Sequence, residues 1–305
     1  MLSGEHVTKL YKTDTGIIHI LVNANFSINP GDFVFITGFS GSGKSTFLKL
    51  LSGEESPLHG NIKFKDFPIH NLSKSAYLKF RQSIGVIYQD YRLIEYKNVF
   101  EDISFVLEAL NYSTKQITEI TNEVLEIVGL THRLKAYPHQ LSGGEKRRVS
   151  IARAIAINPI ILLADEPTGD LDPYNTNIIM EIMRKISERG TTIIMSTHHI
   201  ELVQDYPTSR IWYLQQGQLY LDIPYDTLVG LYFNRTKNSN KASQKSRKNI
   251  LIKRLKGKHN EKLAARIDKL PNIIIDNIEH LTPAILEQFY NLKEKELKEI
   301  LKLIN

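Results

Sequence analysis

The sequence predicts an α/β domain with a mostly parallel central sheet. From residue 1 to about 222, short apolar runs rich in Val, Ile and Phe alternate with longer helical stretches, which is the pattern of α/β domains. Three of these runs are bounded by turn or charged residues, as central parallel strands usually are. The predicted strands are 33–37, 160–164 and 192–196.

A helix is predicted over 173–189. Asp172 is placed to cap it, Pro173 occupies its first turn and Gly190 ends it. Its apolar residues recur at helical spacing, namely Ile178, Ile179, Ile182, Met183 and Ile186.

The remaining segments suggest how the chain is divided. Residues from about 92 to 157 have mainly helical periodicity, broken at Gly129 and Pro138, and indicate an inserted helical subdomain. We therefore expect a main domain over 1–232. A composition rich in Asn, Ser, Lys and Arg predicts a basic linker over 233–258, and an apolar stripe predicts a helical C-terminal extension over 259–305.

Charge is concentrated in one segment. The formal net charge is +6, and ten Lys or Arg residues without any Asp or Glu lie between Arg235 and Lys258. Subtracting those ten charges from +6 leaves −4 for the remainder of the chain.

The absence of cysteine excludes disulfides, thiolate zinc sites and thiol catalysis. No apolar run approaches the roughly 18 to 20 residues that span a bilayer. The first residues lack an export signal, so a cytoplasmic location is expected.

A glycine-rich loop follows the first predicted strand and precedes an apolar helical run. Residues 38–45 fit G-x-x-x-x-G-K-[ST] in the strand-loop-helix setting that a phosphate loop requires. Such glycines let backbone N–H groups and a helix N-terminus point at phosphate, where Lys adds a positive charge. A chance glycine turn is the alternative, and the setting disfavours it. The predicted nucleotide contacts are Gly38, Ser40, Gly41, Ser42, Gly43, Lys44, Ser45 and Thr46.

Two carboxylates follow the second predicted strand. Asp165 is placed to hold Mg²⁺ through its coordinated waters, together with the hydroxyl of Ser45, and Glu166 to polarise the attacking water as general base. An Asp-Glu pair is often only solvated surface. At the carboxyl end of an apolar strand, where α/β sheets bind ligands, the functional interpretation is favoured.

A second anion site is predicted at 141–145. Ser142, Gly143 and Gly144 precede a helical stretch, so they would present a hydroxyl and N–H groups at its N-terminus. An ordinary Ser-capped helix is the alternative. Because one triphosphate seldom needs two such sites in one chain, we expect a homodimer in which this turn covers the nucleotide on the partner's glycine loop.

These residues together resemble the ABC-type ATPases, the nucleotide-binding subunits of transporter-like membrane complexes. The glycine loop, Gln89, the 141–145 turn, Asp165, Glu166, Asp172 and His198 match that family in order and spacing across about 1–222. The resemblance implies a P-loop NTPase fold with a central mostly parallel sheet, an antiparallel β subdomain and an inserted helical subdomain. It also implies ATP and Mg²⁺ as cofactors.

The resemblance assigns roles to four further residues. It implies that Tyr11 stacks on adenine, although a lone aromatic in a strand is more often core or surface. It implies that Gln89 senses the γ-phosphate and metal, that Asp172 lies in a loop crossing the dimer interface, and that His198 contacts the γ-phosphate. Two positions depart from the family pattern, His199 in place of an acidic residue and Arg147 in place of Gln, so the hydrolysis rate could differ.

Within the family, the segment 81–94 most resembles the FtsE group of cell-division ATPases, while 163–172 is shared with lipoprotein-release and macrolide-export ATPases. The FtsE resemblance implies a transmembrane FtsX-type partner, a location on the cytoplasmic face of the plasma membrane and control of cell-wall hydrolases.

For the basic stretch 235–258, a solvated linker and an anionic-lipid contact stay open. Nucleic acid is disfavoured because no aromatic residues are interleaved. Two rival hypotheses are a soluble ABC protein acting on DNA or ribosomes, and an ATP clamp with incidental turnover.

Overall fold

The computed structural model describes residues 1–14, 16–238 and 263 of the chain, with side chains up to 232 and at 263. The chain divides into two compact units, Met1–Ile223 and Pro224–Asn305. In the second unit, helix α8 (Tyr225–Asn238) runs through the domain boundary expected after 232. The rest of the predicted basic linker and the predicted C-terminal extension lie outside the described residues, apart from Leu263, so these divisions stay predictions.

The larger sheet of the first unit is mostly parallel, as predicted. Its strand order is β10-β9-β3-β8-β7-β6, and every neighbouring pair is parallel except β10 with β9. The three predicted strands are β3, β7 and β8 of this sheet. Its members are β3 (Phe33–Thr37), β6 (Ile84–Ile87), β7 (Ile161–Asp165), β8 (Thr192–Thr197), β9 (Arg210–Gln215) and β10 (Gln218–Tyr220).

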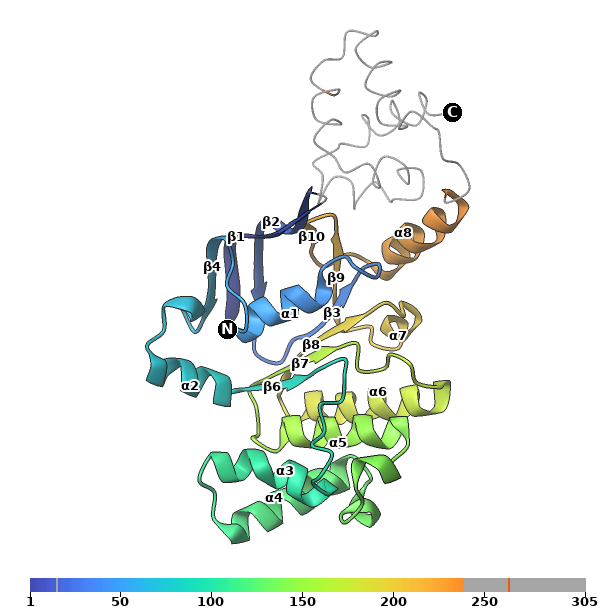
Figure 1. Ribbon diagram of the computed structural model, residues 1–305. Helices are drawn as coiled ribbons and strands as arrows, with labels where there is room; N and C mark the ends of the chain where they lie inside the picture. Colours follow the sequence, from blue (N-terminus) through green and yellow to red (C-terminus); the bar gives the residue numbers. More distant parts are fainter. Residues whose placement is uncertain (15, 239–262, 264–305) are drawn as a thin grey trace. The chain divides into compact units, whose positions relative to one another are not determined.

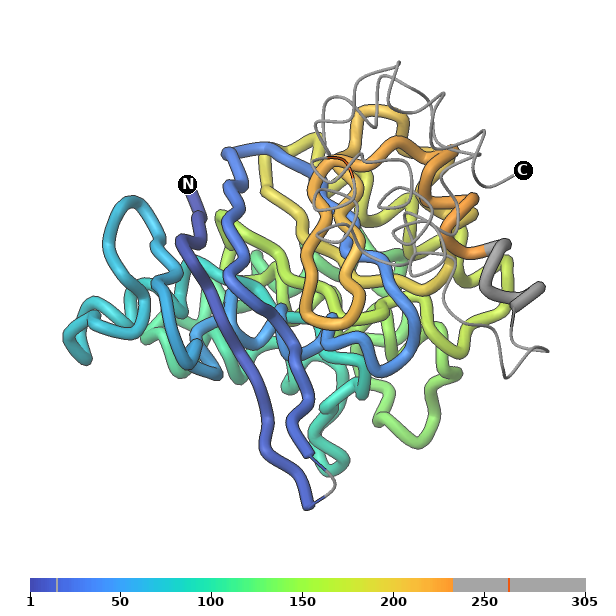
Figure 2. Tube along the Cα trace, turned by 90° about the horizontal axis from the view of Figure 1, so that it is seen from above, coloured from blue at the N-terminus to red at the C-terminus, as the bar shows by residue number. Residues whose placement is uncertain are grey.

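A second, antiparallel sheet has the order β2-β1-β4-β5, which confirms the expected antiparallel subdomain. The β1–β2 hairpin extends beyond the rest of the unit (Figure 2). The strands are β1 (Leu2–Thr13), β2 (Gly16–Ile28), β4 (His59–Phe64) and β5 (Phe67–Pro68).

Helix α1 (Lys44–Ser52) contacts β2 of the antiparallel sheet and β7 and β8 of the central sheet. Its Phe47 is buried among aromatic residues from both sheets. The ring of Phe47 lies 5.2 Å from that of Phe26, edge to face, and 6.3 Å from that of Trp212. The apolar side of α1 thus joins the two sheets into one core and fixes the direction in which the glycine loop enters the helix.

The expected helical insertion is confirmed by three helices that contact one another, α3 (Val99–Ala109), α4 (Thr114–Ile127) and α5 (Gly143–Ile155). The chain turns between them at Gly129, where φ is +69°, and at the short 3-10 helix Pro138–Gln140. Helix α5 lies against β6. Figure 1 shows α5 and α6 (Pro173–Glu188) on the face of the central sheet opposite α1.

Helix α6 begins at the predicted residue and ends one residue before the predicted end, at Glu188. The Asp172 carboxylate accepts a hydrogen bond from the Asn175 amide at 2.9 Å, Pro173 is the first helical residue, and Gly190 follows with φ of +91°. The other helices are α2 (Lys74–Gln82) and α7 (Glu201–Gln204), with 3-10 turns at Ile69–Asn71 and Thr131–Arg133. Within the described part of the chain, none of the helices combines the length and hydropathy needed to cross a bilayer.

Candidate functional site

The glycine loop spans the turn from the carboxyl end of β3 to the first residue of α1. Gly38 and Gly43 have φ values of +150° and +103°, which L side chains rarely adopt. A Cβ on Gly38 would lie 2.5 Å from the carbonyl oxygen of Leu214, and one on Gly43 would lie 2.7 Å from Cγ2 of Ile20. The loop can therefore curl this tightly only with glycine at both positions.

Lys44 points into this curl. Its side chain is 4% exposed, and Nζ donates to the carbonyl oxygens of Gly38 at 3.0 Å and Phe39 at 3.2 Å. The hydroxyl oxygen of Ser42, in the same loop, is buried without a hydrogen-bond partner among the described residues. A buried ammonium and an unpartnered buried hydroxyl next to a helix N-terminus fit the binding of a phosphate group.

The carboxyl ends of β7 and β8 hold a second group of polar residues. Asp165 is paired in register with Ser196, whose hydroxyl donates to Asp165 Oδ1 at 2.7 Å and accepts from the Glu166 amide at 2.9 Å. Ser196 is fully buried. The sequence analysis did not select Ser196, although its place opposite Asp165 at the end of a neighbouring strand was the available signal.

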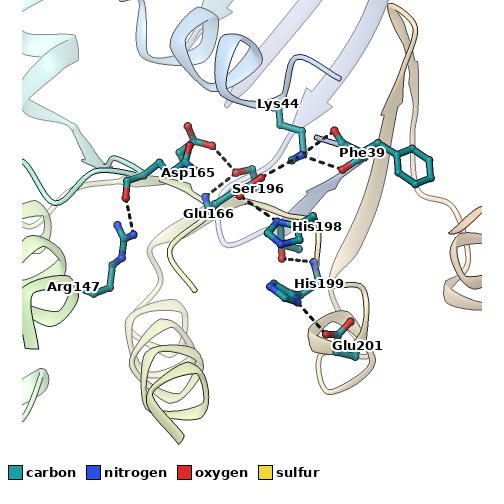
Figure 3. A network of polar contacts seen from close by, with 12 residues as sticks. Phe39, Lys44, Arg147, Asp165, Glu166, Ser196, His198, His199 and Glu201 are labelled. Carbon is teal, nitrogen blue, oxygen red and sulfur yellow. Dashed lines mark hydrogen bonds and ion pairs between the residues drawn. The ribbon is translucent and has the colours of Figure 1, made fainter. Parts of the chain in front are cut away.

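Glu166 joins these two groups (Figure 3). Its Oε1 lies 3.2 Å from Nζ of Lys44 and its Oε2 lies 3.1 Å from Nδ1 of His198. The backbone of Glu166 is left-handed, with φ of +43°. The fold thus brings three predicted site residues, far apart in the sequence, into direct contact.

His199, which departs from the family pattern, lies beside His198. The centroids of the two imidazole rings are 4.1 Å apart. Nδ1 of His199 is 3.1 Å from Oε1 of Glu201, and its backbone amide donates to Thr197 Oγ1 at 3.0 Å. A carboxylate therefore does stand near this position, carried two residues later in the chain.

Gln89 follows the carboxyl end of β6, next to β7. Its carbonyl oxygen accepts a hydrogen bond from Nη2 of Arg147 at 2.7 Å, and that of Tyr88 accepts from Nη1 at 2.6 Å. Arg147 is 2% exposed, and this burial lowers its pKa, while the charge of Asp165 acts in the opposite direction. The structure thus places Gln89 at the same edge of the sheet as Asp165.

The Ser142 turn begins α5. The Ser142 hydroxyl accepts from the Glu145 amide at 3.2 Å, and the Glu145 carboxylate accepts from the Ser142 amide at 2.8 Å and from Nε of Arg133 at 2.8 Å. Burial acts to raise the pKa of Glu145, but these hydrogen bonds hold it below its usual value. Ser142 and Gly143 are exposed, whereas a Cβ on Gly144 would lie 2.2 Å from Oδ1 of Asn175.

The Ser142 turn and the glycine loop lie at helices on opposite faces of the central sheet (Figure 1). They are two separate anion-binding candidates in one chain. Asp172 is exposed and uses its carboxylate to cap α6, with Oδ2 also accepting from Nδ2 of Asn175 at 2.5 Å. Its predicted role in a loop crossing a dimer interface stays a prediction.

Tyr11 lies on β1 near the first turn of α1. Its hydroxyl donates to Oε2 of Glu55 and also has a hydrogen bond with Thr46. Burial and the bond to Glu55 raise the pKa of Tyr11. Nζ of Lys9 lies 5.1 Å from the centre of the tyrosine ring. The structure thus brings Tyr11 beside the glycine loop, as an adenine contact requires, although its stacking role stays a prediction.

The predicted Mg²⁺ contacts come from three elements. Ser45 lies on α1, Gln89 after β6, and Asp165 at the end of β7. Their hydroxyl, amide and carboxylate oxygens are the donor types that Mg²⁺ prefers, so the donor chemistry fits this ion. The described residues contain no cluster of three His, Cys, Asp or Glu side chains arranged as a protein-only metal site.

Comparisons with known proteins agree with this geometry. The sequence profile described as "ABC transporter" matches residues 21–169. The cell division ATP-binding protein FtsE of Mycobacterium tuberculosis is 42% identical over 222 residues, covering 73% of this chain and 95% of that protein. The methionine import ATP-binding protein MetN 2 of Bacillus cereus is 38% identical over 220 residues, covering 72% of this chain and 65% of that protein. Among solved structures, the dimeric post-hydrolysis state of the ATP-binding cassette MJ0796 bound to ADP and Pi has a TM-score of 0.66 at 34% identity, covering 73% of this chain and 100% of that one.

Proposed function

The chain belongs to the ABC transporter family and is an ATP hydrolase, and on that premise we propose that it serves in cell division as an FtsE-type ATPase subunit. The FtsE relative supports this assignment because it is matched along almost its whole length, whereas the methionine import relative extends well beyond the match. The observation that carries the chemistry is the contact of Glu166 with both Lys44 and His198.

In the proposed reaction, ATP places its phosphates on the N–H groups of the glycine loop. Lys44 then neutralises phosphate charge, and His198 contacts the γ-phosphate. Glu166 stands between these two residues, so its carboxylate can accept a proton from water attacking that phosphate. Ser196 would hold the backbone of Glu166 and the carboxylate of Asp165 in a fixed relation.

We assign Mg²⁺ to the oxygens of Ser45, Gln89 and Asp165. When bound, the ion would supply positive charge to neutralise the phosphate oxygens. The chain's own contribution would be orientation, because Ser196 holds Asp165 Oδ1 at 2.7 Å. Tyr11, beside Thr46 of α1, would support the adenine ring.

The active form that we propose is a homodimer with nucleotide shared between two copies. The glycine loop begins α1 and the Ser142 turn begins α5, and these two helices lie on opposite faces of the sheet (Figure 1), which supports a site shared between two copies. A second copy would supply Ser142, Gly143 and Gly144 over the first copy's Lys44, with Asp172 at the interface. The dimeric state of the solved relative MJ0796 supports this arrangement.

The partner that we propose is an FtsX-type transmembrane subunit, with the chain peripheral on the cytoplasmic face of the membrane and hydrolysis controlling cell-wall hydrolases. The segment after Gln89 provides a surface for such a partner, since Tyr96 is 80% exposed and Phe105 is 48% exposed. An anionic-lipid contact through 235–258 is a further proposal from charge alone, and that segment lies largely outside the described residues.

Two experiments test the proposed function. Affinity purification of the tagged chain from native membranes should co-isolate a polytopic membrane protein. Depletion of the chain should produce a division defect that the wild type rescues and the Glu166→Gln variant does not. Normal division after depletion, with impaired methionine uptake or solute export, would favour a transporter subunit instead. Rescue by Glu166→Gln would favour an ATP clamp, and salt-sensitive nucleic-acid binding lost on deleting 235–258 would favour the soluble alternative.

A further inference from the structure

Arg147 is a buried arginine to which the proposed reaction assigns no role. It lies on α5, five residues after Ser142, and its side chain is 2% exposed. Its two terminal nitrogens donate to the carbonyl oxygens of Tyr88 and Gln89 at 2.6 and 2.7 Å. The arginine therefore holds the backbone segment that carries Gln89.

The surroundings of Arg147 differ from those of an ordinary buried cation. Within the described part of the chain it forms no ion pair, and its Nε is buried without a hydrogen-bond partner. The ring of Tyr91 lies 4.8 Å from the guanidinium carbon. A buried charge is costly unless it is well bonded, so the two carbonyl oxygens are the main contacts that keep this side chain in place.

A second arginine extends the attachment. Arg153, six residues further along α5, donates through Nη2 to the carbonyl oxygen of Tyr91 at 3.1 Å and through Nη1 to that of Arg92 at 2.6 Å. Asp102 of α3, which is 1% exposed, holds Arg153 with a contact of 3.2 Å. Four carbonyl oxygens between residues 88 and 92 are thus bonded to one helix.

Segment 88–92 and helix α5 each carry a different proposed nucleotide contact. The segment begins beside the central sheet with Gln89, the proposed contact of γ-phosphate and metal. The helix begins with Ser142, the proposed contact of the other copy's nucleotide. Because Arg147 is bonded to the first and belongs to the second, a displacement of the Gln89 backbone must move the arginine side chain, move α5 or break the hydrogen bond between them.

We propose that Arg147 is a positioning residue for ATP hydrolysis, which sets the place of Gln89 relative to the nucleotide and couples Gln89 to the Ser142 turn. This inference rests on the role of Gln89 in the proposed function. The guanidinium group suits the task because its planar fork donates to two acceptors at once. A shorter, neutral side chain cannot reproduce this pair of charge-assisted bonds.

The test is a double-mutant cycle on the full chain, with ATP turnover, the Mg²⁺ concentration giving half the maximal rate, and ADP affinity as readouts. The variants are Gln89→Ala, Arg147→Gln, their combination, and Arg147→Lys. We expect each single loss to lower kcat about tenfold and to raise the Mg²⁺ requirement, because misplacing a catalytic contact acts on the rate more than on binding. ADP affinity should stay within about twofold, since ADP lacks the γ-phosphate. Arg147→Lys should restore part of the rate.

The combined variant decides the inference. If Arg147 acts through Gln89, the double variant should be no slower than Gln89→Ala alone. Arg184→Gln, which removes an arginine that is 51% exposed on α6, is the matched control and should keep the wild-type rate.

Three results would overturn the inference. Multiplying effects in the double variant would show that Arg147 acts independently of Gln89. A lowered midpoint of thermal unfolding with unchanged kcat, in Arg147→Gln or Arg147→Lys, would show a purely structural role. Wild-type turnover by Gln89→Ala would remove both the inference and the role assigned to Gln89, whereas the first two results would leave the proposed function intact.

Discussion

Replacing Glu166 by Gln is the most direct test of the proposed reaction. The carboxylate lies 3.2 Å from Nζ of Lys44 and 3.1 Å from Nδ1 of His198, with 16% of its side chain exposed. Glutamine keeps the size and shape of this side chain. It cannot accept a proton from water, so the change removes the base and its negative charge while keeping the shape of the side chain.

The expected magnitude follows from these contacts. A positioned general base contributes about 10²- to 10⁴-fold, which corresponds to about 2.7 to 5.4 kcal/mol in the activation free energy at about 1.36 kcal/mol for each factor of ten. Lys44 keeps the carbonyl oxygens of Gly38 and Phe39 as acceptors, so the folded state should persist. The variant also loses a negative charge where phosphate would bind. ATP affinity should therefore be retained or increased.

The assay combines phosphate release with isothermal titration of ATP on the same preparation. Glu188→Gln is the matched control, because it removes an exposed carboxylate of α6 outside the site and should keep the wild-type rate. A Glu166→Gln variant that binds ATP and retains more than about a tenth of the wild-type rate would refute the base assignment, since the loss would lie below the range for such a base. Loss of ATP binding would refute it too.

Three further predictions concern the loop and the fold. Gly38→Ala should weaken ATP binding at least about tenfold, because its Cβ would lie 2.5 Å from a backbone oxygen. In the same ATP titration the control Gly230→Ala should bind as tightly as the wild type. Equal ATP affinities of Gly38→Ala and the wild type would contradict the reasoning. Burial acts to raise the pKa of Asp222, but hydrogen bonds from Arg210 lower it overall. Its stabilisation is therefore complete above the unfolded value of about 3.9 and is lost as pH falls through the lower folded value. The urea midpoint of unfolding, measured from pH 7 to 3, should fall more steeply for the wild type than for Asp222→Asn. Parallel curves of midpoint against pH for the two proteins would contradict the stabilising role of the Asp222 charge. Trp212→Ala should cost about 3–5 kcal/mol in the free energy of unfolding, because Trp212 is fully buried; urea unfolding followed by circular dichroism measures this, and a cost below about 1 kcal/mol would contradict the packing.

Local sequence patterns predicted much of the central sheet. The run 33–37 is β3, β7 is shifted one residue toward the C-terminus from the predicted run 160–164, and β8 extends one residue beyond the predicted run 192–196. Helix α6 has the predicted cap and stop. These features depend on short-range physics, because apolar runs, caps and glycine turns act within a few residues.

The bonds between distant residues were not predictable in the same way. Ser196 bridges Asp165 and the Glu166 amide only because β7 and β8 pair in one particular register. In the sequence, Arg147 was only a departure from a family pattern. Its hydrogen bonds to the carbonyl oxygens of Tyr88 and Gln89 require α5 to lie against β6. A side chain's partner across two elements depends on their packing, which periodicity does not specify.

The sequence by itself determined that this protein binds a phosphate group at the loop beginning with Gly38, because the chemistry of that loop is contained in consecutive residues. Only the tertiary structure decided that Glu166 contacts Lys44 and His198. Strand β8 lies between β3 and β7 in the sheet, although it comes last of the three in the chain. The carboxyl ends of these parallel strands therefore meet at one edge, and the residues that follow them form one site.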